Sequence, residues 1–185
     1  MTSVAQSPTA AQRAAAVQLL LLDVDGVLTD GRLHFGAAGE AMKSFDVRDG
    51  HGIKLLQAGG VEVAILSARS SAIVAARARE LAITRVLQGE ADKHAAFVRL
   101  LAEFKLSAAQ CGFIGDDWPD LRVLAEVGFA ATVADAAAEV KSLAHWIAPA
   151  AGGRGAVRAA AEFILRAQGK FDALLQRYQR EAQHA

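Results

Sequence analysis

The sequence predicts an α/β protein with a Rossmann-like three-layer sandwich built around a mainly parallel sheet. Short apolar runs alternate with stretches of helical periodicity along most of the chain, which indicates strands joined by helical crossovers. The first run, residues 19–22, consists of four leucines, as expected of a strand that is buried on both faces. The chain has 185 residues, of which 53% are hydrophobic and 22% charged, so it can bury a sizeable core.

One domain is expected between two tails. We place it at residues 19–168, because the alternation of apolar runs and helical patterns begins and ends there. The amino-terminal tail, residues 1–18, is rich in Ala, Gln, Ser and Thr and predicts at most a short helix over residues 9–17. The carboxy-terminal tail, residues 169–185, follows a glycine and can be helical up to Tyr178.

A small β-hairpin insertion is expected directly after the first strand. Residues 32–47 contain two short runs that flank Gly36 and Gly39, a pattern typical of a hairpin. No second domain fits between the first two long strands, so no cap domain is expected. Further strands are predicted at residues 61–66, 85–87, 112–114 and 129–133, with helices at residues 71–81, 92–104, 120–126, 135–143 and 156–168.

Charge and composition argue against several classes of partner. The 20 Lys and Arg residues balance the 20 Asp and Glu residues, so no global field attracts nucleic acid or an anionic membrane. No apolar run reaches the ~20 residues that span a bilayer, and residues 1–18 lack the pattern of a secretory signal. A single cysteine, Cys111, cannot form an internal disulfide, which favours a reducing, cytoplasmic location.

Two carboxylates directly follow the first strand. Asp23 and Asp25 are two positions apart in an extended segment, so both side chains face the same way, and Gly26 allows the chain to turn there. Two such anions repel each other, and a hard divalent cation is the favoured way to hold them together. With a cation bound, one carboxylate can act as a nucleophile and the other as a proton donor. The pair therefore predicts phosphoryl transfer.

Polar residues at three later strand ends extend this candidate site. Open parallel sheets bind ligands beyond the carboxyl ends of their strands. Ser67 offers a hydroxyl beside free amides at the start of a helix, where phosphate oxygens can bind. Lys93 begins another helix and can neutralise a phosphate or a carboxylate. The acidic loop at residues 115–120 can complete a magnesium shell with oxygen ligands.

A signalling receiver-like module is an alternative from another class. Receivers also use aspartates, a hydroxyl residue and a lysine on a parallel sheet to hold an aspartyl phosphate. A receiver would carry its phospho-acceptor after a later strand, however, whereas here Asp23 follows the first one. The order of the motifs therefore argues against a receiver.

Taken together, the motifs resemble the haloacid dehalogenase superfamily of phosphotransferases. That family carries Asp-x-Asp, then Ser or Thr, then Lys, then Gly-Asp-Asp-x-x-Asp, and this chain matches the order throughout. The resemblance implies that Asp23 attacks phosphorus, that Asp25 protonates the leaving oxygen and then activates water, and that Ser67 and Lys93 orient the phosphoryl group. It also implies a Mg²⁺ ion. The implied metal residues are Asp23, Asp25 (through its backbone carbonyl) and Asp116, with Asp117 and Asp120 supporting the metal waters or Lys93 in an order that the sequence does not rank.

Four longer strings carry a narrower resemblance, to the family of 3-deoxy-D-manno-octulosonate 8-phosphate phosphatases. These strings are residues 23–31, 45–52, 115–117 and 152–158. The resemblance implies hydrolysis of that phosphorylated sugar acid in lipopolysaccharide sugar biosynthesis. It also implies an uncapped homotetramer in which the hairpin and a neighbour's carboxy-terminal segment cover the site. The residues that it suggests for substrate binding are Arg48, Gly50, Arg69, Arg154 and Arg158.

The identity of the sugar stays open at this point. Ala159 stands where many relatives carry Glu, and a nine-carbon keto-deoxy sugar acid phosphate could fill a similar uncapped pocket. A catalytically silent subunit that binds a sugar acid is a further alternative. The joint presence of Asp23, Asp25, Lys93 and Asp116 argues against silence.

Overall fold

A six-stranded sheet forms the centre of the computed structural model, which describes residues 7–183 and, for residues 181–183, the backbone alone. The sheet order is β5-β4-β1-β6-β7-β8, and every paired strand is parallel to its neighbour. This confirms the predicted fold class. The part of the predicted amino-terminal tail before residue 7 lies outside the described residues. The strands are β1 (Leu19–Leu22), β4 (Glu62–Leu66), β5 (Arg85–Leu87), β6 (Cys111–Ile114), β7 (Phe129–Thr132) and β8 (Trp146–Ile147).

The strand order places the candidate site. β1 lies between β4 and β6, so the chain first extends the sheet on one side and then returns to extend it on the other. Such a reversal leaves a crevice beyond the carboxyl ends of the central strands. The residues that follow β1, β4 and β6 therefore meet at one edge of the sheet. The leucines of β1 are fully buried, as their position in the centre of the sheet requires.

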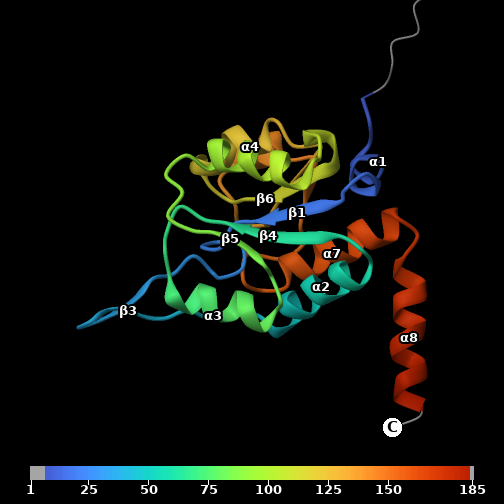
Figure 1. Ribbon diagram of the computed structural model, residues 1–185, viewed down its shortest axis with the longest axis horizontal. Coiled ribbons are helices and arrows are strands. Elements are labelled where there is room, and N and C mark those ends of the chain that lie inside the picture. The colour runs from blue at the N-terminus through green and yellow to red at the C-terminus, as the bar shows by residue number, and fades with distance from the viewer. Residues whose placement is uncertain (1–6, 184–185) are drawn as a thin grey trace, which may run out of the picture.

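Helices cover both faces of this sheet. Figure 1 shows α4 on one face, with α2, α3 and α7 on the other. Three of these helices begin at side chains that accept a hydrogen bond from the first turn, namely Asp46 for α2, Ser71 for α3 and Asp92 for α4. The helices are α2 (Val47–Ala58), α3 (Ala72–Glu80), α4 (Lys93–Phe104), α5 (Leu121–Leu124), α6 (Ala138–Leu143) and α7 (Ala156–Ala167).

The predicted hairpin is confirmed as an antiparallel pair. Its strands are β2 (His34–Gly36) and β3 (Gly39–Met42), and Figure 1 shows the pair projecting away from the body of the molecule. Phe35 is 65% exposed and Met42 is 50% exposed, so the hairpin presents apolar side chains to its surroundings. The hairpin projects from the domain, and the base of the hairpin joins it to the domain.

The two ends of the chain are helical. α1 (Ala10–Ala15) confirms the short amino-terminal helix, and the Thr9 side chain caps it. α8 (Phe171–Gln183) extends past the predicted end at Tyr178 and stands away from the sheet in Figure 1. None of the helices within residues 7–183 combines the length and the hydropathy of a membrane-spanning segment.

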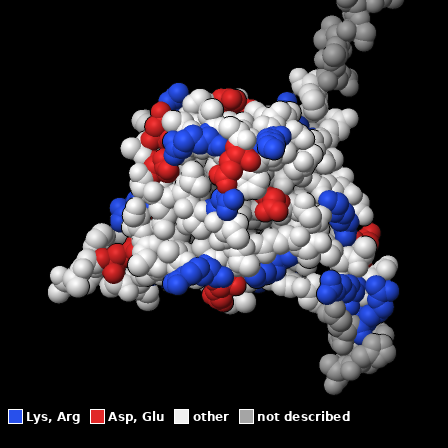
Figure 2. Space-filling model, in the orientation of Figure 1, with Lys and Arg blue, Asp and Glu red and all other residues white. Residues whose placement is uncertain are grey.

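Charges of both signs are interspersed on the face of the molecule shown in Figure 2, apart from a group of basic side chains near α8. This mixture agrees with the balanced composition of the chain. Local geometry, rather than a broad electrostatic field, must therefore select any anionic ligand.

Candidate active site

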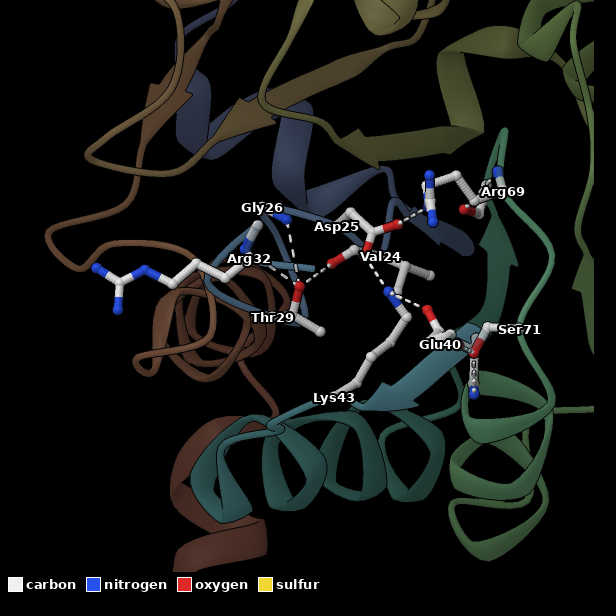
Figure 3. A network of polar contacts seen from close by, with 12 residues as sticks. Val24, Asp25, Gly26, Thr29, Arg32, Glu40, Lys43, Arg69 and Ser71 are labelled. Carbon is white, nitrogen blue, oxygen red and sulfur yellow. Dashed lines mark hydrogen bonds and ion pairs between the residues drawn. The ribbon is translucent and has the colours of Figure 1, made fainter. Parts of the chain in front are cut away.

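The loop after β1 is held in a tight turn. The Asp23 amide continues the sheet by donating to the Ile114 carbonyl at 3.0 Å. The Thr29 hydroxyl donates to the Val24 carbonyl and accepts hydrogen bonds from the amides of Gly26 and Gly31 (Figure 3). Both aspartates of the first motif are thereby fixed relative to β1.

Gly26 is required by the close approach of the acidic loop. Its φ is +92°, and a Cβ atom there would lie 2.1 Å from Oδ2 of Asp116. Any side chain would therefore be strained and would displace Asp116. The first and the fourth sequence motifs are in direct contact at this point.

A buried cluster joins three carboxylates to one ammonium group. Lys93 Nζ lies 2.9 Å from Asp23 Oδ1 and 2.6 Å from Asp120 Oδ1. Asp23, Asp120 and Lys93 are all buried, and Asp116 is half-buried beside them. The four side chains come from the ends of β1, β5 and β6, as the strand-end argument predicts.

Charge in this cluster is unbalanced, and the pKa values reflect it. Burial, followed by the charge of Asp120, raises the pKa of Asp23 to about 7. Burial, followed by the charge of Asp23, raises the pKa of Asp116 to about 8. Burial lowers the pKa of Lys93, but the neighbouring carboxylates outweigh this and raise it above its ordinary value. When ionised, the three carboxylates of the cluster carry more negative charge than the one ammonium group of Lys93 can balance.

The cluster fits a hard divalent cation. Carboxylate oxygens of Asp23, Asp116 and Asp120 lie within 4.8 Å of one another. Oδ1 of Asp116 is buried and has no hydrogen-bond partner among the described residues, so it can bind a ligand. Oxygen ligands of this kind suit Mg²⁺, which would also supply the missing charge. Asp23 and Asp116 are the two side chains best placed to bind it.

Asp120 and Asp117, which the sequence left unranked, differ clearly in the structure. Asp120 is buried, its Oδ1 pairs with Lys93, and its Oδ2 accepts from the amides of Asp116 at 3.0 Å and Asp117 at 3.4 Å. Asp117 is exposed. Asp120 therefore orders both the acidic loop and the lysine, whereas Asp117 faces solvent at the edge of the cavity.

Ser67 and Arg69 complete the lining of one open cavity of about 370 Å³. Ser67 is buried, and its hydroxyl accepts from the Arg69 amide at 3.3 Å. Arg69 Nε lies 3.5 Å from Oδ2 of Asp25. The structure thus brings together most of the predicted site. The residues that line this cavity are Asp23, Asp25, Gly31, Ser67, Ala68, Arg69, Lys93, Asp116, Asp117, Pro119 and Asp120.

Four of the five residues predicted to bind substrate do not line this cavity. Arg48 pairs with Asp46 at 2.8 Å and donates to the Arg154 carbonyl at 3.1 Å. Arg158 pairs with Glu162 within α7. Gly50 faces the guanidinium of Arg77 instead. Their substrate contacts stay a prediction, because none of Arg48, Gly50, Arg154 and Arg158 lines this cavity in a single copy of the chain.

The glycine-rich segment before α7 packs behind the loop that holds Asp25. The Gly153 amide donates to the Val27 carbonyl at 2.9 Å. A Cβ atom on Gly152 would lie 1.8 Å from the carbonyl oxygen of Gly26. The buried carboxylate of Asp49 accepts from the Gly155 amide at 3.1 Å and so ties this segment to α2. The segment supports the catalytic loop from behind.

Sequence reasoning missed Lys43. This lysine directly follows β3, its side chain is only 1% exposed, and its Nζ forms an ion pair with Oδ1 of Asp25 (Figure 3). Burial lowers the pKa of Lys43, but the hydrogen bonds that its ammonium group donates to Asp25 and Glu40 outweigh this effect, and the net pKa is raised. Only a folded hairpin brings Lys43 to Asp25, so spacing in the sequence gave no signal.

The fold and the paired aspartates suit a hydrolase that acts by phosphoryl transfer, and comparison with known proteins places the chain in a family of hydrolases. The family model described as haloacid dehalogenase-like hydrolase matches residues 75–159. The chain belongs to this family, because a curated relative matches it at 44% identity over 161 residues.

That relative is the 3-deoxy-D-manno-octulosonate 8-phosphate phosphatase of Yersinia pestis, and the match covers 87% of this chain and 86% of the relative. The crystal structure of the corresponding enzyme from Moraxella catarrhalis, in complex with magnesium, phosphate and KDO, is similar with a TM-score of 0.89. It is 38% identical, covering 91% of this chain and 97% of the other. The cobalt-bound enzyme from Haemophilus influenzae has a TM-score of 0.84 and 42% identity, covering 86% of this chain and 94% of the other.

Proposed function

We propose that this chain is a magnesium-dependent phosphatase that hydrolyses 3-deoxy-D-manno-octulosonate 8-phosphate to the free sugar acid and phosphate, in lipopolysaccharide sugar biosynthesis. The observation that carries the proposal is the buried cluster in which Asp23 contacts Lys93, beside an oxygen of Asp116 that has no partner within residues 7–183. Relatives that match nearly the whole chain carry this activity in their names, which supports the same substrate here.

The first chemical step transfers the phosphoryl group to Asp23. A carboxylate oxygen of Asp23 attacks phosphorus, and the bond between phosphorus and the sugar oxygen breaks. Asp25 gives a proton to that oxygen, so the sugar leaves as an alcohol. Lys93, which is 2.9 Å from Asp23, and the hydroxyl of Ser67 hold the oxygens of the transferring group.

The second step releases phosphate. A water molecule attacks phosphorus, and Asp25, now a carboxylate, accepts a proton from that water. The bond between phosphorus and Asp23 breaks, which restores the Asp23 carboxylate and yields inorganic phosphate. One aspartate thus acts as the nucleophile in the first step, while the other acts as acid and then as base.

Magnesium has a defined place in this proposal. The carboxylates of Asp23 and Asp116 and the backbone carbonyl of Asp25 would hold the ion. When bound, Mg²⁺ supplies positive charge that offsets the charge on the phosphoryl oxygens. Related structures that hold magnesium or cobalt support a divalent ion at this site.

The proposed active form is a homotetramer in the cytoplasm. The cavity is open in a single chain, and Phe35 and Met42 on the hairpin are exposed apolar side chains that a neighbouring copy would cover. In that assembly Arg48, Gly50, Arg154 and Arg158 would join Arg69 as substrate-binding residues. A cytoplasmic location agrees with the one buried, unpaired cysteine. Mass measurement in solution tests the assembly.

Release of phosphate from a panel of sugar phosphates tests the function. The panel contains the eight-carbon substrate, the nine-carbon keto-deoxy analogue and common hexose phosphates, each with Mg²⁺ and with a chelator. We expect repeated turnover of the eight-carbon substrate that requires Mg²⁺, and little turnover of the hexose phosphates. Preference for the nine-carbon compound would replace the eight-carbon compound as the proposed substrate. A single turnover would indicate a receiver-like module. Binding without any phosphate release would favour a silent sugar-acid-binding subunit.

A further inference from the structure

The hairpin contributes a buried cation to the catalytic loop. Lys43 Nζ contacts Oδ1 of Asp25 and lies 3.1 Å from Oε1 of Glu40. Figure 3 shows the lysine reaching from the base of the hairpin toward Asp25. The lysine side chain is 1% exposed, whereas Phe35 and Met42 on the same hairpin are largely exposed. The hairpin therefore directs its one buried charge at the proton-transferring residue.

The two oxygens of Asp25 have different surroundings. Oδ1 is occupied by Lys43, while Oδ2 lies 3.5 Å from Nε of Arg69, which lines the cavity together with Asp25. A charge-assisted hydrogen bond at one oxygen restricts the rotation of the carboxylate and leaves the other oxygen for a ligand. Oδ2 is accordingly the oxygen that can reach a ligand.

Glu40 holds the lysine in place. One of its oxygens pairs with Lys43, and the other accepts a hydrogen bond from the hydroxyl of Ser71, the residue that caps α3. α3 follows the segment that carries Ser67 and Arg69. The contacts therefore run from Asp25 through Lys43 and Glu40 to the second phosphate-binding segment, and the hairpin links two of the catalytic motifs.

We propose that Lys43 is a positioning residue for Asp25, which fixes Oδ1 so that Oδ2 exchanges protons with the sugar oxygen and then with water. This inference rests on the proposed function. A role in stability alone is a weaker explanation, because a buried ion pair is poor evidence for stability once the cost of removing both charges from water is counted. Catalytic carboxylates, in contrast, need close control of orientation.

Two substrates with different leaving groups test the proposal. The variant Lys43→Met keeps the length of the side chain and removes its charge. We expect it to lower kcat/KM for the sugar phosphate by at least about 10-fold, since a placed proton donor typically contributes ~10²–10⁴-fold. For p-nitrophenyl phosphate, whose leaving group departs without a proton, we expect a loss of less than about 3-fold.

The ratio of the two kcat/KM values is the decisive quantity. It does not depend on how much of the preparation is folded, so a loss of stability alone leaves it unchanged. Asp25→Asn should change the ratio in the same direction, and adding Lys43→Met to Asp25→Asn should change it little further. Arg32→Met serves as the matched control, because Arg32 is exposed and points away from Asp25 in Figure 3.

Each outcome has a distinct meaning. A larger loss on the sugar phosphate than on p-nitrophenyl phosphate supports the role of Lys43. An active wild type together with an unchanged ratio in Lys43→Met overturns this inference and leaves the proposed function intact. If the wild type turns over neither the sugar phosphate nor p-nitrophenyl phosphate, the proposed function is overturned, and the inference with it.

Discussion

Asp120 illustrates how a residue without a chemical step can control the site. Its two oxygens contact Lys93 and the amides of Asp116 and Asp117, so it fixes the lysine and the acidic loop of the candidate site at once. Asp120 also raises the pKa of Asp23, after the larger effect of burial. The position of one buried carboxylate thus affects three groups in the mechanism.

Replacing Asp120 should cost both stability and activity. We expect Asp120→Ala to lower the free energy of unfolding by about 2–4 kcal/mol, because it removes one of the two carboxylates that pair with the buried Lys93 and the acceptor of two amides. Asp117→Ala, at the exposed neighbouring position, should cost about 1 kcal/mol or less. Urea denaturation and phosphate release measure both effects. Equal losses in the two variants would contradict the ranking.

Most of the residues that line the candidate site could be predicted from the sequence, because they follow strands. Asp23 and Ser67 directly follow apolar runs, and Asp116 comes one residue later, so the geometry of a parallel sheet brings them together. The contact of Lys43 with Asp25 and the ranking of Asp120 over Asp117 could not be predicted. Both depend on how a hairpin and a loop pack against the sheet, and this packing has no fixed spacing in the sequence.

Among the glycines, Gly152 in the segment before α7 has the closest neighbour. A Cβ atom at Gly152 would overlap the Gly26 carbonyl, at 1.8 Å, in the loop that holds Asp25. Backbone atoms cannot yield cheaply at such a distance. This segment and the catalytic loop must therefore fit each other closely.

Adding one methyl group there should disturb catalysis. We expect Gly152→Ala to lower the free energy of unfolding by about 2 kcal/mol or more and to reduce kcat, because the loop carrying Asp25 must shift. Gly36→Ala is the control, since its Cβ would meet the Ala41 Cβ at an ordinary 3.5 Å. Thermal unfolding and phosphate release are the measurements. Wild-type values for Gly152→Ala would show that the loop does not need this fit.

Elements with a local signal in the sequence were predicted well, and elements without such a signal were not. β1 and the hairpin lie where expected, because continuous leucines and paired glycines are local signals. β8 has only two residues and was missed, because it forms by pairing with β7 rather than by its own pattern. α8 runs past Tyr178 because its polar sequence gives no clear stop signal.

For the whole molecule, the raised carboxyl pKa values connect stability to pH. Asp23 and Asp116 have pKa values of about 7 and about 8 in the folded protein, against ordinary values of 3.8. Because the folded state binds these protons more tightly, their contribution to stability is fully present below pH 3.8. That contribution is lost as the pH rises through about 7 and 8 in the metal-free protein.

Magnesium should reverse that loss. Bound Mg²⁺ requires ionised carboxylates, so it competes with the protons and stabilises the folded state more as the pH rises. We expect the Mg²⁺-induced increase in Tm to be larger at about pH 8 than at about pH 6. KCl at equal ionic strength is the control, and Asp116→Asn should weaken the effect. An increase that is independent of pH would argue against metal binding by this cluster.

Trapping the phosphorylated enzyme tests the central claim most directly. Enzyme that is turning over a substrate labelled in its phosphoryl group is quenched in acid and mapped by peptide mass spectrometry. We expect label on Asp23 in the wild type and in Asp117→Asn, and no label in Asp23→Asn, whose turnover should fall by at least about 10³-fold. Label on another residue, or near-normal turnover by Asp23→Asn, would contradict it.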